Sequence, residues 1–158
     1  MKLKASVDYG ARAIVYLAVK GDTCSSREIS EEMSVPRDYL IQLALRLRNA
    51  GLIKARPGKN GGYALAKDPA KITIAQILNA FDDDLKHERQ ELKKSRKEAP
   101  SATMVREIHG TIMGSLDSFL ESICIQDMLD AYNGGEAPEL LMAAALEKEA
   151  AKLRSKTK

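Results

Sequence analysis

The sequence predicts a mainly α-helical fold with a small β-hairpin wing, namely a winged helix-turn-helix domain followed by a long dimerisation helix. Three observations predict it. A capping-box spacing and a proline delimit two short amphipathic segments between residues 25 and 51. Two short apolar runs flank a glycine-rich, basic turn at 56–62. An apolar stripe then recurs every three or four positions beyond residue 101. The expected segments are a winged helix-turn-helix DNA-binding domain (1–82), a charged linker (83–101), the dimerisation helix (102–132) and a C-terminal helical tail (133–158).

The first two helices are marked by residues that favour helix ends. Ser6 can cap a helix over roughly 7–19, and the Gly-Asp-Thr sequence at 21–23 ends it. Ser25 and Glu28 have the S-x-x-E spacing of a capping box, which opens a short second helix. Both helices carry apolar residues at helical spacing, so each is expected to contribute to one small core.

A third helix and a hairpin follow. Pro36 suits the first turn of a new helix, because its missing N–H needs no partner there, and Gly51 ends that helix. The apolar face of this helix consists of Leu40, Leu43, Ala44 and Leu47. Two short strands over 52–55 and 63–66 enclose the basic turn 56–62. A capped helix pair followed by such a wing is typical of proteins that insert one helix into the major groove of DNA.

The remaining segments extend this domain. Thr73 and Gln76 have capping-box spacing and open a helix that reaches about Ala80. The stretch 82–98 contains six acids and six Lys or Arg residues. It therefore cannot bury enough apolar surface to order itself, although Glu–Lys pairs can support an exposed helix. A final helix over 139–152 has a weak apolar face made of Leu140, Leu141, Ala144 and Leu146.

The long helix over 102–132 is expected to form a homodimer. The winged domain already has its own core, so the apolar stripe of this helix is expected to pack against the same helix of a second subunit. Gly110 and Gly114 indicate either close approach across the dimer or mere tolerance of glycine. The expected dimerisation residues are Met104, Ile108, Ile112, Leu116, Phe119 and Ile123.

Positive charge is concentrated in the recognition helix and the wing. The segment 37–67 carries seven Lys or Arg residues and one acid, a net charge of +6, whereas the whole chain is +3 and the remainder is therefore −3. A charge run alone usually marks a solvated face. Combined with the helix-turn-helix and wing spacing, it predicts a surface for double-stranded DNA.

The candidate DNA-binding residues lie on the recognition helix and the wing. Arg can pair with guanine and Gln with adenine, whereas Tyr39 has the alternative role of a core aromatic and Arg46 is better placed for backbone or intramolecular contacts. Glycines in the wing let its cations approach phosphates or the minor groove. A nucleotide-binding loop is disfavoured, because no Lys-Ser/Thr pattern follows. The candidates are Arg37, Tyr39, Gln42, Arg46, Arg56 and Lys59.

A set of short motifs follows in a fixed order along residues 1–83. They are Tyr9 with Ala13, Tyr16, Leu17 and Ala18; Ile29-Ser30 with Val35; residues 39–43 leading into 46–53; residues 61–66; and residues 72–78. In this order and spacing the chain resembles the Rrf2 (Rrf-two) family of bacterial winged helix-turn-helix transcriptional regulators. The resemblance implies a homodimeric transcription factor, often a repressor, that binds a pseudo-palindromic operator.

Cysteine content decides what cofactor is expected. Cluster-binding members of the family that the chain resembles carry three cysteines between the winged domain and the dimer helix, and the corresponding stretch 82–103 contains none. Thiolates are the usual ligands of iron–sulfur clusters, so a cluster-free regulator with no cofactor and no metal is expected. His87 and His109 are too sparse for a metal site. The candidate redox residues are Cys24, in a loop where it can be exposed, and Cys124, for which a buried structural role is favoured.

Composition excludes several classes of function. The chain has no apolar run that could span a bilayer and no apolar signal core, and its two cysteines lie 100 positions apart, so a cytoplasmic protein without membrane contact is expected. No catalytic motif is present, which argues against an enzyme. The alternatives are a thiol-redox or metabolite-responsive sensor acting through a partner protein, and a winged-helix protein-interaction adaptor. The effector stays open between a small molecule, a partner protein and a thiol switch.

Overall fold

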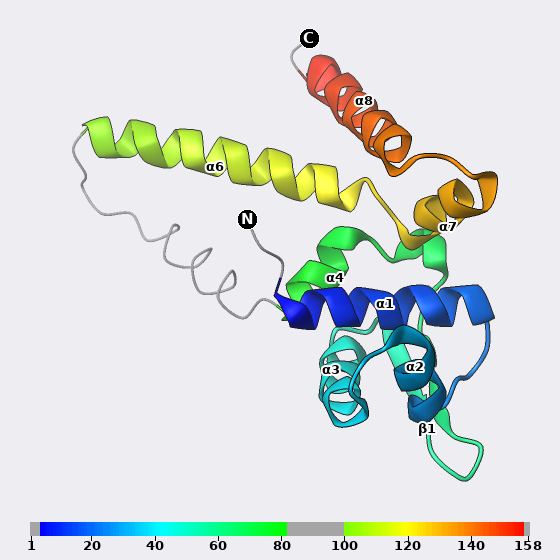
Figure 1. The fold of residues 1–158 in the computed structure, drawn as a ribbon. Helices are drawn as coiled ribbons and strands as arrows, with labels where there is room; N and C mark the ends of the chain where they lie inside the picture. The colour runs from blue at the N-terminus through cyan, green and yellow to red at the C-terminus, as the bar shows by residue number, and fades with distance from the viewer. Residues whose placement is uncertain (1–3, 82–99, 157–158) are drawn as a thin grey trace.

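The computed structural model describes residues 4–81 and 100–156 and shows a small helical domain from which one long helix extends (Figure 1). The prediction of a mainly α-helical fold with a two-stranded hairpin is confirmed. The elements are α1 Ala5–Lys20, α2 Ser26–Met33, α3 Arg37–Asn49, β1 Ile53–Arg56, β2 Gly62–Leu65, the 3-10 turn η1 Pro69–Lys71, α4 Ile74–Phe81, α6 Pro100–Glu121, α7 Ile125–Gly134 and α8 Pro138–Lys156. The predicted charged linker falls mostly on residues 82–99, which lie outside the described residues.

The ends of α1 and α2 agree with the sequence signals only in part. The prediction that Ser6 caps α1 is wrong: the helix begins two residues earlier, at Ala5, and the backbone carbonyl of Lys4 accepts the first hydrogen bonds. Ser25 does cap α2, with its hydroxyl accepting from the Glu28 amide at 3.1 Å. Instead of completing a capping box, the Glu28 carboxylate accepts a 2.9 Å hydrogen bond from the Tyr16 hydroxyl, which ties α2 to α1.

The core lies where the helices of the winged domain meet. All four residues predicted for the apolar face of the recognition helix are buried. In α4, Gln76 donates its backbone N–H to the Thr73 hydroxyl at 3.3 Å, as expected of a cap, and this orientation buries Ile77 and Phe81. The largest fully buried side chains are Ile14, Leu17, Ile29, Leu40, Leu47, Leu52, Ile72, Ile77, Ile125 and Val35.

The wing is anchored to the loop that precedes α2. Strands β1 and β2 pair antiparallel, with Ile53 opposite Leu65 and Arg56 opposite Gly62. Cys24 extends this pairing, because its N–H and C=O exchange hydrogen bonds of 2.9 and 2.8 Å with Tyr63. An added Cβ at Gly62 would overlap the carbonyl oxygen of Cys24, so this close approach requires glycine.

The prediction of one continuous helix over 102–132 is wrong. The chain leaves the helical conformation after α6, and Cys124 caps the separate helix α7 by accepting from the Asp127 amide while Asp127 accepts from the Cys124 amide. Around this break the backbone pairs with the segment that leads into α4: Ile74, the first residue of α4, donates to Ile123 at 3.0 Å, and Ile125 donates to Ile72 at 2.9 Å. These bonds bury two isoleucines spaced by two residues, which is the period of extended chain and not of a helix.

The final helix α8 packs with a different face from the predicted one. Leu140, Ala144 and Leu146 are exposed, whereas Ala145 and Glu149 are buried. The Glu149 carboxylate accepts a 2.7 Å hydrogen bond from Ser118 of α6 and pairs with Lys152 at 2.6 Å. A hydrogen-bonded carboxylate therefore joins α8 to α6, which hydrophobic periodicity alone does not reveal.

Candidate nucleic-acid interface

Helix α3 presents one long side to solvent on the lower face of the domain (Figure 1). Its buried residues occupy a single stripe, so the residues between them point outward. Arg37 and Gln42, both predicted as DNA-binding residues, lie on this exposed side. The same side also presents Asp38, Ile41, Leu45, Arg48 and Asn49.

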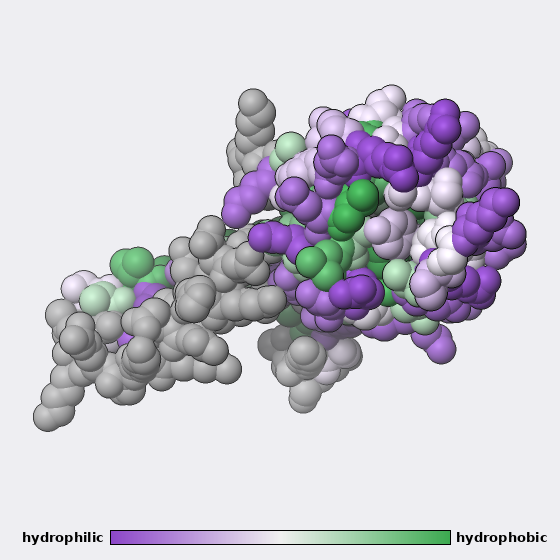
Figure 2. Space-filling model, turned by 90° about the horizontal axis from the view of Figure 1, so that it is seen from below, coloured by the Kyte–Doolittle hydropathy of each residue, from purple (hydrophilic) through white to green (hydrophobic). Residues whose placement is uncertain are grey.

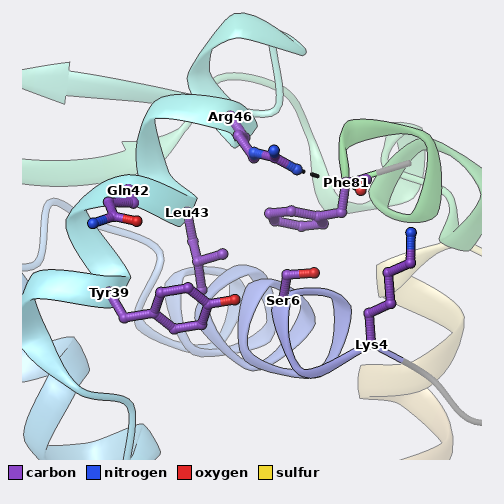
Figure 3. Close-up of a pocket in the computed structure, with 7 residues that line it drawn as sticks. All are labelled: Lys4, Ser6, Tyr39, Gln42, Leu43, Arg46 and Phe81. Atoms are coloured by element: carbon purple, nitrogen blue, oxygen red, sulfur yellow. Dashed lines mark hydrogen bonds between the residues drawn. The ribbon is translucent and has the colours of Figure 1, made fainter. Parts of the chain in front are cut away.

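Tyr39 and Arg46 lie on the flank of α3 that faces α1 and α4 (Figure 3). Tyr39 is half-buried and meets the Tyr9 ring edge to face, with 5.9 Å between the ring centroids. Arg46 donates from Nη1 to the Phe81 carbonyl oxygen at 3.4 Å, at the last residue of α4. Tyr39 therefore occupies the position of a packed aromatic, which was its alternative role in the sequence analysis. Both side chains hold α3 against its neighbours.

These two residues line a hollow of about 330 Å³ between α3, the start of α1 and the end of α4. Figure 3 shows the Tyr39 and Ser6 side chains on one side of it and Arg46 reaching towards Phe81. Lys4 and Gln42 complete its polar rim. The hollow lies beside the recognition helix, so it belongs to the same surface.

The wing adds a cationic notch to this surface. A second hollow, of about 380 Å³, lies where the N-terminal ends of α2 and α3 meet the wing, and its cations are Arg27, Arg37, Arg56 and Lys59. Arg37 donates to the Ser26 hydroxyl at 3.4 Å, while Arg27 pairs with Glu31 on its own helix at 2.8 Å. Gly58 lies at the wing tip with φ +110°, a conformation that suits glycine. The structure thus brings Arg37 together with the two predicted wing cations, and the notch has the charge that a phosphate requires.

Sequence reasoning missed an apolar pair on the recognition helix. Ile41 and Leu45 are 45% and 50% exposed, one helical turn apart. Figure 2 views this face and shows hydrophobic surface bordered by hydrophilic side chains. The available signal was their spacing: both are large apolar residues outside the stripe that fills the core.

Comparison with known proteins agrees with this geometry. The sequence model of the Rrf2 family, described as an iron-dependent transcriptional regulator, matches residues 3–131. The chain belongs to the Rrf2 family. The family relatives are transcriptional regulators and not enzymes, in line with the absence of catalytic motifs from the sequence.

Individual relatives and solved structures support membership of the Rrf2 family. A Synechocystis protein named as an HTH-type transcriptional regulator is 38% identical over 54% of this chain, and the match spans 59% of that relative's length. A Neisseria meningitidis protein named in the same way is 28% identical over 89% of this chain and 96% of its own. The structure of T. potens IscR superposes with a TM-score of 0.67 at 25% identity, covering 87% of this chain and 92% of that one. The global cysteine regulator CymR of B. subtilis gives a TM-score of 0.62 at 27% identity, covering 81% and 95%.

The Rrf2 family description mentions iron, so the side chains of this chain that could ligate iron are compared with what a cluster requires. Within residues 4–81 and 100–156, no three His, Cys, Asp or Glu side chains gather into a metal-binding group. Residues 82–103 contain no cysteine. Cys24 and Cys124 are held in separate backbone pairings, with Tyr63 and with Thr73. The residues described by the structure therefore do not fit a thiolate-ligated cluster.

The two thiols differ from their predicted environments. Cys24 is 3% exposed and not at the surface, because its backbone pairing with Tyr63 draws it under the wing. Cys124 is only partly buried and caps α7 instead of lying within a helix. Burial raises the pKa of the Cys24 thiol, and burial together with the hydrogen bond to Asp127 raises that of Cys124. Both shifts reduce the thiolate population on which reactivity depends.

Helix α6 exposes half of its predicted apolar stripe. Met104, Ile108 and Ile112 are exposed. Leu116 and Phe119 are half-buried. Placing Ile123 on this stripe is wrong, because the break after α6 turns it into the interior. None of the described helices is long and apolar enough to cross a membrane.

Proposed function

We propose that this Rrf2-family regulator is a homodimeric, cytoplasmic repressor that binds a pseudo-palindromic operator without an iron–sulfur cluster. The observation that carries the proposal is the shared placement of the exposed side of α3 and the cationic notch of the wing on one face. An exposed helix beside a basic wing matches the width of the major groove and the charge of its phosphates. In a two-fold dimer the two copies of α3 would lie about 34 Å apart, one turn of the duplex.

The roles of the exposed residues follow from their positions. Arg37 and Gln42 lie in the first turns of α3, where recognition helices contact base edges. Arg56 and Lys59 lie on the wing and bind phosphates or the minor groove. Tyr39 and Arg46 act as positioning residues through Tyr9 and the end of α4.

Alanine substitutions separate base reading from phosphate binding. Gln42→Ala is expected to relax sequence preference, with a loss of about 1–3 kcal/mol against the preferred operator and little loss against other duplexes. Arg56→Ala combined with Lys59→Ala should weaken all duplexes alike and reduce the slope of log K against log salt by about 2. Fluorescence anisotropy titrations at several salt concentrations measure both effects.

The outcomes of these titrations are distinct. Identical behaviour of the α3 and wing variants would contradict the division of labour. If the wild-type protein bound no duplex even at low salt, the protein-interaction adaptor would be favoured instead.

The cluster-free state predicts a colourless regulator. Protein purified without oxygen should lack visible absorbance, and an iron chelator should leave operator affinity unchanged, because residues 82–103 offer no thiolates. Absorption near ~400 nm with stoichiometric iron and sulfide would contradict this if Cys124→Ser abolished it. Serine is itself a strong N-cap, so this variant should keep the start of α7 intact.

A further inference from the structure

Ile41 and Leu45 form an apolar pair on the outward side of α3. Neither belongs to the core cluster of the domain or to the residues packed against it. They are four residues apart on a helix, so their side chains are neighbours on its surface. Large apolar side chains exposed together are costly in water and commonly mark a surface that another molecule covers.

The surroundings of the pair specify the charge of the molecule that covers it. Within the same exposed side of α3 lie Arg37, Gln42 and Arg48 with a single acid, Asp38, and the wing adds Arg56 and Lys59 beside it, so the net charge around the pair is positive. This cationic border disfavours an apolar protein partner or a second copy of the same face and favours a polyanion. Duplex DNA is the polyanion that α3 and the wing are proposed to bind.

The floor of the major groove has one apolar feature that side chains can contact. Thymine presents its C5-methyl group there, next to donors and acceptors that polar residues read. An isoleucine and a leucine cannot hydrogen-bond to a base, so the contact through which they can distinguish one base from another is with such a methyl group.

We propose that Ile41 and Leu45 read C5-methyl groups of pyrimidines and so place thymines in each half-site of the operator. The inference rests on the proposed function, because it assumes that α3 enters the major groove. Ile41 lies one turn nearer the N-terminal end of α3, the end that approaches base edges most closely. Its contribution is therefore expected to exceed that of Leu45.

Removal of single methyl groups from the DNA tests the proposal. Duplexes selected by the full-length protein from a random-sequence pool supply the operator, and each thymine is then replaced by deoxyuridine, which lacks only the methyl group. The wild-type protein should bind at least one such duplex about 4-fold more weakly, the factor that corresponds to ~0.8 kcal/mol per buried methyl group. Affinities are compared at one salt concentration.

A double-mutant cycle assigns each methyl group to its side chain. At the position read by Ile41, the Ile41→Ala variant should bind the thymine and deoxyuridine duplexes equally, while the Leu45→Ala variant should lose discrimination at a different position. Val19→Ala removes a similarly exposed apolar residue of α1 and should keep the full wild-type discrimination. Because all three side chains are exposed, none of these variants should disturb the fold.

Duplexes with cytosine or 5-methylcytosine test whether the methyl group itself is read, because thymine and 5-methylcytosine both carry a C5-methyl group. At the mapped position, 5-methylcytosine should bind more tightly than cytosine, with thymine still preferred because the donors and acceptors of its base pair are also read. Equal affinity for cytosine and 5-methylcytosine there would overturn the proposal.

Two further results would also overturn the proposal. One is wild-type binding that is indifferent to deoxyuridine at every position. The other is discrimination that survives unchanged in both Ile41→Ala and Leu45→Ala. Absence of any duplex binding at low salt would overturn the proposed function itself, whereas methyl-insensitive binding overturns only the roles of Ile41 and Leu45.

Discussion

Replacing Ile112 with glutamate is expected to dissociate the proposed homodimer and to weaken operator binding by roughly 100-fold or more, because the two half-sites are no longer bound jointly. Ile112 is 59% exposed in the single chain and lies near the middle of α6, on its apolar stripe. In a two-fold interface the substitution buries two unpaired carboxylates, each at a cost of several kcal/mol. The fold of each subunit should be unaffected, since the side chain has few partners within it.

Light scattering combined with operator titrations measures both consequences of Ile112→Glu. Glu107→Lys is the matched control, because it reverses a charge on an exposed part of the same helix that points away from the apolar stripe. This control should remain dimeric and bind the operator normally. A stable monomer of the wild-type protein, or a dimeric Ile112→Glu variant, would place the subunit interface elsewhere.

Replacing Gly62 with alanine is expected to lower the free energy of unfolding by about 2–4 kcal/mol through overpacking and the loss of backbone hydrogen bonds. The added Cβ would overlap the Cys24 carbonyl oxygen, which belongs to the backbone and not to a flexible side chain. To relieve this overlap, the hydrogen bonds between Cys24 and Tyr63 must open. The wing would then lose its anchor, so affinity should fall for every duplex and not only for the operator.

Chemical denaturation and DNA titrations of Gly62→Ala test this expectation. Gly134→Ala serves as the control, because a Cβ there meets only Glu136 Cγ at 3.7 Å and lies at the end of a helix. The control should be neutral or more stable by up to about 1 kcal/mol, since alanine is the better helix former. If the free energy of unfolding of Gly62→Ala stays within about 0.5 kcal/mol of the wild-type value, the contact between the wing and the loop before α2 is not rigid.

The helix-turn-helix and the wing could be predicted from the sequence because their signals are local. The Ser25 cap, Pro36 and Gly51 each act within one turn of chain, and the structure places the ends of α2 and α3 beside them. The buried stripe of α3 follows from its helical period in the same way.

The orientation of the candidate DNA-binding residues could not be predicted from the sequence. Arg37, Gln42 and Arg46 are all exposed on α3, but Arg46 also donates to the Phe81 carbonyl of α4. Tyr39 is half-buried and packs against Tyr9 of α1. Ile41 is exposed on the same helix, although polarity alone does not indicate it as a base-contacting residue. The direction of a side chain around a helix depends on which stripe the rest of the fold covers.

The sequence alone thus determined the winged domain, the family resemblance and an apolar stripe beyond residue 101 for which the winged domain offers no core position. The tertiary structure decided where the long helix breaks, which thiol is buried and which face of α8 packs. The break joins Ile123 and Ile125 to residues 72–74, some fifty positions earlier, and Cys24 is buried by pairing with Tyr63. Hydrogen bonds between distant segments override a local helical period when they bury apolar side chains, and no window of sequence contains both partners.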